Sequence, residues 1–339
     1  MAKFRLYKLH FTSPFHINDQ RSDDGTSQHI IHSDALYAAL ISCLAKYGQP
    51  IPNDGELGFT VTSLFPYYQA SSQSCPVYFL PIPLLNQFSD EVPKENIKAL
   101  KKVKWVDATL YESILAGNQL LQGNMGDQSC IQGVYYSRLK IYEDNEGSYE
   151  FVHAEVVQRV KIEDRTGHSD AVPYYVERIT FADESGLYFL AQGDTTILEK
   201  ALKLLSAEGI GSDRNVGFGF FTFETCDMEI GIPENADHVI SLSFFIPESE
   251  EQLNDMLDSE KVAYDFTRRS GWITTPPYNT LRKNAIYGFM PGSVFRNIHD
   301  CTIQCLGGIV DLCPNIGEDS PNHPIWRNGK SIMLPIKCE

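Results

Sequence analysis

The segment Glu208–Phe221 reads Glu-Gly-Ile-Gly-Ser-Asp-Arg-Asn-Val-Gly-Phe-Gly-Phe-Phe, with four glycines and one arginine, Arg214, between the two glycine pairs. Glycine accepts positive φ and has no side chain, so a charged ligand can approach such a backbone closely. Bare N–H groups beside an arginine predict a seat for a phosphodiester. A helix C-cap followed by an ordinary turn is the simpler explanation of the glycines alone. The segment is neither a P-loop nor a dinucleotide fingerprint, because it lacks Gly-Lys-Ser/Thr and Gly217-Phe-Gly219 opens a strand.

The elements around this glycine loop predict an α+β fold. Upstream, Asp194-Thr-Thr196 starts a helix whose expected buried face is Leu198, Ala201, Leu202 and Leu205, and downstream Phe220–Ile230 alternates like a strand. Near the N-terminus, Lys3–Phe11 predicts a strand with one bulge. Either side chain of Ser33-Asp34 is expected to cap a helix that ends at Gly48.

The order of these elements predicts two domains. Strand, helix, strand, inserted strands, helix, glycine loop and strand favour a ferredoxin-like or RNA-recognition-motif-like (RRM-like) sandwich over residues 1–230. The segment 231–237 has the composition of a linker. Residues 238–339 repeat strand and helix patterns less regularly, which predicts a second, degenerate RRM-like domain. Its predicted elements are the strand Val239–Ile246, the acidic helix Glu248–Leu257, and the strands Val262–Trp272, Arg282–Met290 and Ser331–Ile336.

The net charge of −16 argues against a free-standing nucleic-acid-binding protein. Any contact with RNA must use a local patch inside a larger assembly. The charge is uneven, since Glu248–Glu260 holds six acids and no base. The segment that follows is basic, with Lys261, Arg268, Arg269, Arg282, Lys283 and Arg296.

Composition also bounds the cellular setting and the cofactors. No apolar run approaches the ~20 residues of a membrane span, and the first residues lack the apolar core of a signal peptide, so we expect a cytoplasmic protein without a membrane partner. The eight cysteines form no C-x-x-C pair and have spacings unlike a zinc ribbon. We therefore expect no metal and no cofactor.

Several further motifs occur in one order along the chain. They are His10-Phe-Thr-Ser-Pro-Phe-His16-Ile, His32-Ser-Asp-Ala-Leu-Tyr-Ala-Ala39, Gln158–Gly167, Gly186-Leu-Tyr-Phe-Leu190, Arg269-Ser-Gly-Trp272, Pro291-Gly-Ser-Val-Phe295 and His323-Pro-Ile-Trp-Arg-Asn-Gly329. Together with the glycine loop, this series resembles the repeat-associated (RAMP) superfamily of CRISPR proteins. Within that superfamily it is similar to the 5′-handle-binding subunits of type III-A Csm complexes. The sequence departs from the family pattern at Ser212-Asp213, where a Gly and a basic residue are common.

The resemblance implies a non-catalytic subunit for CRISPR interference and antiviral defence. Its implied partners are the 5′ handle of the CRISPR RNA (crRNA), the large polymerase/cyclase-like subunit, the backbone RAMP subunit, and target RNA near the 5′ end of the guide. It also implies a β-hairpin thumb inserted in the first domain, here from about Glu155 to Glu177. The RNA contacts expected on this basis come from His16, Ser33, Arg159, Lys161, Arg165, Thr166, Gly209, Gly211, Arg214, Gly217, Gly219 and Phe220.

Two alternatives remain open at this point. Some RAMP relatives cleave CRISPR RNA with a histidine, and His16, His29 and His32 offer a general acid or base for attack by a 2′-hydroxyl without a metal. No Lys or Arg lies at the start of the following helix, so we expect these histidines to be structural or RNA-contacting. The second alternative is the equivalent subunit of a type III-B complex. Outside these two RAMP alternatives, the net charge of −16 and the acidic segment Glu248–Glu260 also fit a scaffold protein that binds neither DNA nor RNA.

Overall fold

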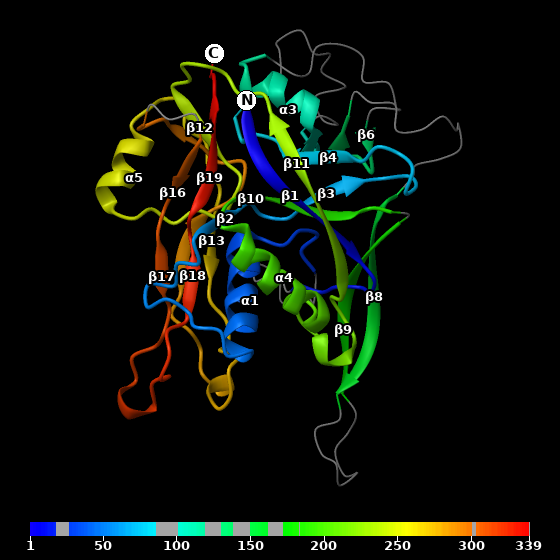
Figure 1. Cartoon of the computed structure of the whole chain (residues 1–339), viewed down its shortest axis with the longest axis vertical. Helices are drawn as coiled ribbons and strands as arrows, with labels where there is room; N and C mark the ends of the chain where they lie inside the picture. Colours follow the sequence, from blue (N-terminus) through cyan, green and yellow to red (C-terminus); the bar gives the residue numbers. More distant parts are fainter. Residues whose placement is uncertain are drawn as a thin grey trace.

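The computed structural model describes residues 1–17, 27–85, 101–118, 130–137, 150–161, 172–182, 184–299 and 303–338. Within these ranges the largest unit is a nine-stranded sheet with the order β11-β1-β10-β3-β4-β5-β7-β6, and β2 also pairs with β10 (Figure 1). The strands of this main sheet are β1 (Ala2–Phe11), β2 (Phe59–Val61), β3 (Phe65–Tyr68), β4 (Val77–Pro81), β5 (Trp105–Asp107), β6 (Cys130–Ile131), β7 (Tyr135–Tyr136), β10 (Gly186–Gly193) and β11 (Phe221–Ile230).

Helices α1 (Ser33–Lys46) and α4 (Thr195–Glu208) lie side by side on one face of the main sheet (Figure 1). The Asp194 carboxylate caps α4 by accepting a hydrogen bond from the Thr196 N–H at 2.9 Å. The predicted apolar face of α4 is confirmed, because its buried residues are Leu198, Ala201, Leu202 and Leu205. They pack into one core with α1 and with side chains of β1, β10 and β11.

The predicted cap of α1 is wrong. The helix begins at Ser33 after the N-cap residue His32, whose side chain makes no capping hydrogen bond. The Ser33 hydroxyl instead accepts a hydrogen bond from the Phe244 N–H at 2.8 Å, and the Asp34 carboxylate is held by two arginines from the C-terminal part of the chain. The start of α1 therefore joins distant segments, and sequence spacing alone does not reveal such a contact.

The other face of the main sheet packs against α3 (Ala108–Leu115) and a second sheet of order β15-β12-β19-β16. One hydrophobic cluster contains side chains from both sheets, for example Leu6 and Leu190 with Leu242 and Leu334. Helix α5 (Glu250–Leu257) covers the far side of the second sheet and buries Met256 there. The strands of this sheet are β12 (His238–Ser241), β15 (Val294–Arg296), β16 (Gln304–Leu306) and β19 (Ser331–Ile336).

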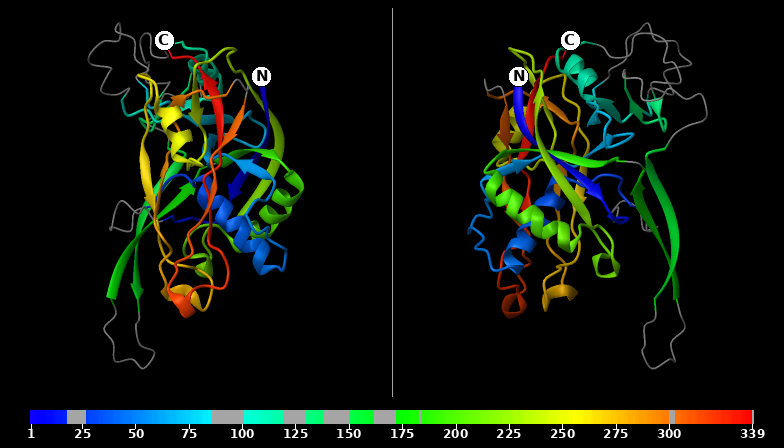
Figure 2. Two further views of the ribbon diagram at one scale, coloured as in Figure 1. Left: turned by 90° about the vertical axis from the view of Figure 1, so that its left-hand side faces the viewer. Right: turned by 45° about the vertical axis from the view of Figure 1, so that its right-hand side comes forward.

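Three two-stranded ribbons complete the described fold: β8 (Val152–Lys161) with β9 (Val172–Phe181), β13 (Phe266–Arg269) with β14 (Ile286–Phe289), and β17 (Ile309–Asp311) with β18 (Trp326–Asn328). The first of them is a hairpin that projects from the body of the molecule (Figure 2). Short 3-10 turns lie at η1 (Arg214–Val216), η2 (Tyr278–Thr280) and η3 (Gly317–Asp319).

Two sequence expectations about strands need correction. The expected bulge in the first strand is absent, since β1 pairs with β11 residue for residue from Ala2–Ile230 to Phe11–Phe221. The break in its alternation arises because Leu6 and Tyr7 are both fully buried, one on each face of the sheet. Several predicted strands also extend too far, as in the segment 262–272, where β13 covers only Phe266–Arg269.

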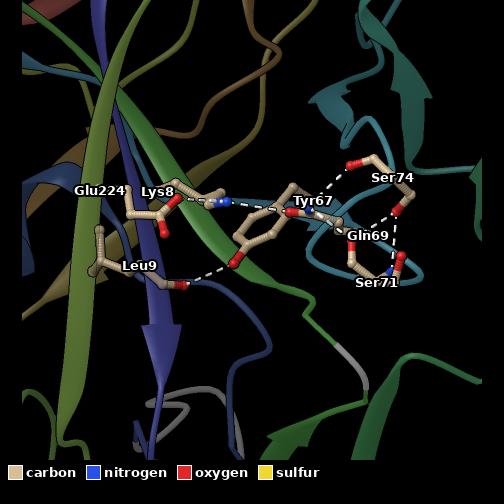
Figure 3. Close-up of polar contacts among 7 residues, drawn as sticks. All are labelled: Lys8, Leu9, Tyr67, Gln69, Ser71, Ser74 and Glu224. Atoms are coloured by element: carbon tan, nitrogen blue, oxygen red, sulfur yellow. Dashed lines mark hydrogen bonds and ion pairs between the residues drawn. The ribbon is translucent and has the colours of Figure 1, made fainter.

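A polar cluster on the main sheet satisfies its own hydrogen bonds (Figure 3). The Lys8 ammonium nitrogen lies 2.8 Å from Glu224 Oε2 and 3.2 Å from Gln69 Oε1. The Gln69 amide also donates to the carbonyl oxygens of Ser71 and Ser74 at 2.9 and 3.0 Å. These contacts tie β1 and β11 to the turn after β3.

No helix in the described part of the chain is long and apolar enough to cross a membrane. Across the same residues, no cluster of three or more histidine, cysteine, aspartate or glutamate side chains has the arrangement of a metal site.

Candidate nucleic-acid interface

The glycine loop borders a pocket of about 590 Å³. The loop supplies residues 211–215, and the C-terminal ends of α1 and α4 supply the neighbouring wall. One residue, Thr274, comes from the C-terminal part of the chain. The complete lining is Lys46, Tyr47, Ala207, Glu208, Gly211, Ser212, Asp213, Arg214, Asn215 and Thr274.

Three of the four loop glycines are required by close backbone contacts. A Cβ atom at Gly219 would lie 2.0 Å from the Ile210 carbonyl oxygen, and one at Gly209 would lie 2.6 Å from the Phe218 carbonyl oxygen. At Gly211 the Cβ would lie 2.6 Å from the His16 carbonyl oxygen. Gly217 has φ +93° but open space around it. The glycines therefore fold the loop tightly onto the exit of β1.

Backbone hydrogen bonds within the protein occupy most of the loop N–H groups that the sequence predicts as hydrogen-bond donors to a phosphate. Gly209 donates to Leu205, Gly217 to Arg214, and Gly219 to Pro14, all at 2.8–3.1 Å. Ser212 donates to the His16 carbonyl at 2.9 Å. The expectation of a seat made of bare N–H groups is thus wrong for Gly209, Gly217 and Gly219, whose N–H groups stabilise the loop instead.

Arg214 supplies the positive charge of the pocket that no described carboxylate neutralises in an ion pair. The other cation, Lys46, pairs with Glu208, and the Tyr47 hydroxyl donates to the same carboxylate at 3.1 Å. The hydrogen bond from Lys46 lowers the pKa of Glu208, so this carboxylate is ionised at neutral pH. Arg214 forms no ion pair with any described residue, and it is partly exposed. Tyr47 is 49% exposed, which leaves a ring beside an available guanidinium.

Arg159 connects the β8–β9 hairpin to the glycine loop. Its Nη1 lies 2.8 Å from Asp213 Oδ2, and its guanidinium carbon lies 4.6 Å from the centre of the Phe218 ring. Asp213 has φ +60°, a left-handed conformation that holds its carboxylate toward the hairpin. Arg159 therefore has protein partners in this structure, and Phe218 is buried beneath it.

His16 also has a structural role. Its side chain is 7% exposed, and Nδ1 lies 2.8 Å from the Glu177 carbonyl oxygen of β9. His32 is buried and lines a different pocket together with Trp105. His16 and His32 thus lie in different surroundings, whereas His29 lies near Glu177, the residue whose carbonyl oxygen contacts His16.

The other predicted contacts divide into three groups. Ser33 is only 1% exposed, so it is not accessible to a ligand. Phe220 is half-buried, and its N–H donates to the Ser13 hydroxyl at 2.9 Å. Lys161 ends β8 at the distal part of the hairpin, whereas Arg165 and Thr166 lie outside the described residues.

Of the residues that line the pocket, the sequence predicted only Gly211 and Arg214 as contacts, and those that it missed include Lys46, Tyr47 and Glu208. Their positions held a signal. Lys46 and Tyr47 directly precede Gly48, which ends α1, and Glu208 directly precedes the first loop glycine. Two helices that end beside the same loop bring their last residues into its wall.

Matches to protein-family models show to which family the chain belongs. The family model for the RAMP superfamily matches residues 8–222, more than half of the sequence. The chain belongs to the RAMP superfamily. A second model, for the CRISPR Csm4 C-terminal domain, matches residues 234–336 of this RAMP protein.

Curated relatives of this RAMP protein carry the name CRISPR system Cms protein Csm4. The relative from Thermococcus onnurineus is 26% identical over 302 residues, which cover 84% of this chain and 88% of the relative. The relative from Methanocaldococcus jannaschii is 23% identical and covers 98% of this chain and 97% of its own length.

Solved structures share the fold over the whole chain. A chain of the Csm3–Csm4 subcomplex from a type III-A CRISPR-Cas interference complex superposes with a TM-score of 0.63 at 18% identity, covering 99% of this chain and 100% of that chain. A chain of a Csm1–Csm4 cassette in complex with cA4 gives a TM-score of 0.58 at 19% identity, with 100% and 99% covered.

Proposed function

We propose that this RAMP protein is the Csm4-type subunit of a type III-A CRISPR interference complex, in which it binds the 5′ handle of the crRNA. The pocket beside the glycine loop carries the proposal, because it holds an arginine without an ion pair among the described residues beside an exposed tyrosine ring. An arginine suits a phosphate, and an exposed ring suits a splayed base. Arg214 and Tyr47 are the proposed contacts.

The architecture supports this assignment at a second level. The order β11-β1-β10-β3, with α1 after β1 and α4 after β10, supports a ferredoxin-like arrangement of residues 1–230. The division into domains at 231–237 stays a prediction, as does the role of the β8–β9 hairpin as a thumb. The hairpin is suited to that role, because Arg159, near the distal end of β8, ties it to Asp213 of the glycine loop.

The proposed protein partners come from the relatives. Structures of related chains contain Csm3 and Csm1 beside Csm4. We propose that this chain likewise docks on a backbone RAMP subunit and on the large subunit. The names and the C-terminal family model favour this type III-A role over the type III-B alternative.

We also propose that the chain is not a nuclease. A metal-free cleavage site needs an acid and a base about one phosphate apart, and the contacts of His16 and His32 place them in different surroundings. With its Nδ1 beside a backbone carbonyl oxygen, His16 is suited to hold β9 rather than to move a proton.

The test uses the full chain and a labelled single-stranded RNA with the handle of its own CRISPR repeat. Arg214→Gln should weaken equilibrium binding by about 1–3 kcal/mol, the size of a lost charge-assisted contact. Arg5→Gln is the matched control, since it removes one arginine that pairs with Asp227 on the main sheet. Equal affinity for both variants would contradict the pocket, and a specific cleavage product lost in His16→Ala would favour the nuclease instead.

A further inference from the structure

A second surface with nucleic-acid chemistry lies on the β13–β14 ribbon. In this antiparallel pair Arg268 is opposite Tyr287, and Phe266, two residues before Arg268, lies on the same side of β13. The alternating residues Thr267 and Arg269 are buried. One side of the ribbon is thus packed against the protein, while the other carries exposed side chains.

The packed side fixes the orientation of the ribbon. A Cβ atom at Gly288 would lie 2.2 Å from the Phe244 ring, so the backbone of β14 sits directly on that ring. The Arg269 guanidinium lies 5.0 Å from the same ring, and its Nε is 3.0 Å from the Asp34 carboxylate. Rotation of the ribbon would break these contacts, so the other side stays exposed.

Three aromatic rings are exposed on the ribbon or just beyond it. Phe266 is 52% exposed, Tyr287 is 61% exposed, and Trp272, just beyond the end of β13, is 53% exposed. The rings of Phe266 and Tyr287 contact each other edge to face, with centroids 6.0 Å apart. Neighbouring rings with large exposed fractions are typical of a surface that binds a partner.

Two arginines accompany these rings. Arg282 lies over the Trp272 ring at 4.7 Å, across the narrow end of the ribbon. Neither Arg268 nor Arg282 forms an ion pair with any residue in the described ranges, in contrast to the buried Arg269. In a chain of net charge −16, two arginines that have no carboxylate partner in the described part of the chain, beside exposed rings, form a local cationic patch.

We propose that Phe266, Arg268, Trp272, Arg282 and Tyr287 form a ribbon face that binds single-stranded RNA, with the arginines on phosphates and the rings on splayed bases. Asp265 is the acidic neighbour at one end of the ribbon face. Toward the other end, Thr274, two residues after Trp272, lines the glycine-loop pocket. The gold strands β13 and β14 also lie on the side from which the β8–β9 hairpin projects (Figure 2, left). This surface is distinct from the proposed handle pocket.

The experiment titrates the full chain with a short single-stranded oligouridylate and follows tryptophan emission and anisotropy. Stacking on Trp272 should quench the emission, and Trp272→Phe should remove most of that quenching. Arg268→Gln and Arg282→Gln should each weaken binding about fivefold or more and reduce the slope of log affinity against log salt by about 0.7. Arg296→Gln is the matched control, because it removes an exposed arginine of β15 that pairs with Asp258.

Unchanged quenching in Trp272→Phe, or unchanged affinity and salt slope in both arginine variants, would overturn the ribbon face. So would variants that bind RNA normally but fail to assemble with a protein subunit, since the face would then be a protein interface. Arg214→Gln separates this proposal from the handle pocket. If the wild-type chain shows no quenching by oligouridylate, the ribbon face is wrong but the handle pocket is unaffected. If Arg214→Gln binds the handle normally, the handle pocket is wrong but the ribbon face is unaffected.

Discussion

Gly219 and Gly217 show why the glycine loop tolerates some substitutions and not others. Both have positive φ, but only at Gly219 would a Cβ meet backbone, 2.0 Å from the Ile210 carbonyl oxygen. Gly217→Ala should lower the free energy of unfolding by about 1–2 kcal/mol, the cost of left-handed backbone. Gly219→Ala should lower it by about 2–5 kcal/mol, because overpacking adds to that cost. Chemical denaturation measures both, and equal losses would show that the loop relaxes around the new methyl group.

At this scale the sequence predicted Arg214 as a phosphate contact, which stays a prediction, whereas the roles of other loop residues were not accessible from the sequence. Glycine density indicates tight backbone, but it does not tell whether the N–H groups face a ligand or the protein. That depends on the exit of β1, where Pro14 and His16 accept the N–H groups of Gly219 and Ser212. The partner of Arg159, Asp213, is likewise distant in sequence and needs the folded loop.

The start of α1 is the part of the fold whose stability is most sensitive to a change of charge. Asp34 is buried, and its Oδ2 lies 3.0 Å from Arg269 Nε and 2.9 Å from Arg327 Nη1. Burial alone would raise the pKa of Asp34, but the two arginines outweigh it and lower that pKa below its usual value. The neighbouring Lys283 has a pKa lowered to about 8, first by burial and then by Arg327.

Asp34→Asn should destabilise the chain by about 3–5 kcal/mol at neutral pH, because it leaves two buried guanidinium groups without a counter-charge. A lowered carboxyl pKa gives stability that is fully present above the usual aspartate value near 4 and is lost as the pH falls through the folded value. Wild type should therefore lose stability below about pH 4, and Asp34→Asn should lose less over that range. Denaturation across pH measures this, with the exposed Asp227→Asn as control. Parallel curves for wild type and Asp34→Asn would rule out the pairing.

Elements with one buried face were predictable, whereas elements buried on both faces were not. The periodicity of α4 gave its four buried residues because the opposite face meets solvent. In β1 both faces are covered, by helices on one side and by α3 and the second sheet on the other, so alternation suggested a bulge that does not exist. The small ribbons are held mainly by long-range packing, which explains the overlong strand predictions around 262–290.

The whole molecule combines a strongly acidic surface with two local sites of the opposite character. Net charge −16 opposes binding of free RNA, so RNA binding at the proposed pocket and the proposed ribbon face would rest on short-range contacts.

The most direct measurement is photo-crosslinking within the complex assembled from the chain's own operon, using crRNA with a photoreactive group at its 5′ end. Mass spectrometry then maps the crosslinked peptides. We predict crosslinks to the glycine loop at residues 209–219 or to the adjoining wall at Lys46 and Tyr47, and a marked loss of these crosslinks in Arg214→Glu. Crosslinks from the 5′ end to other subunits alone, in a complex that contains this chain, would contradict this prediction.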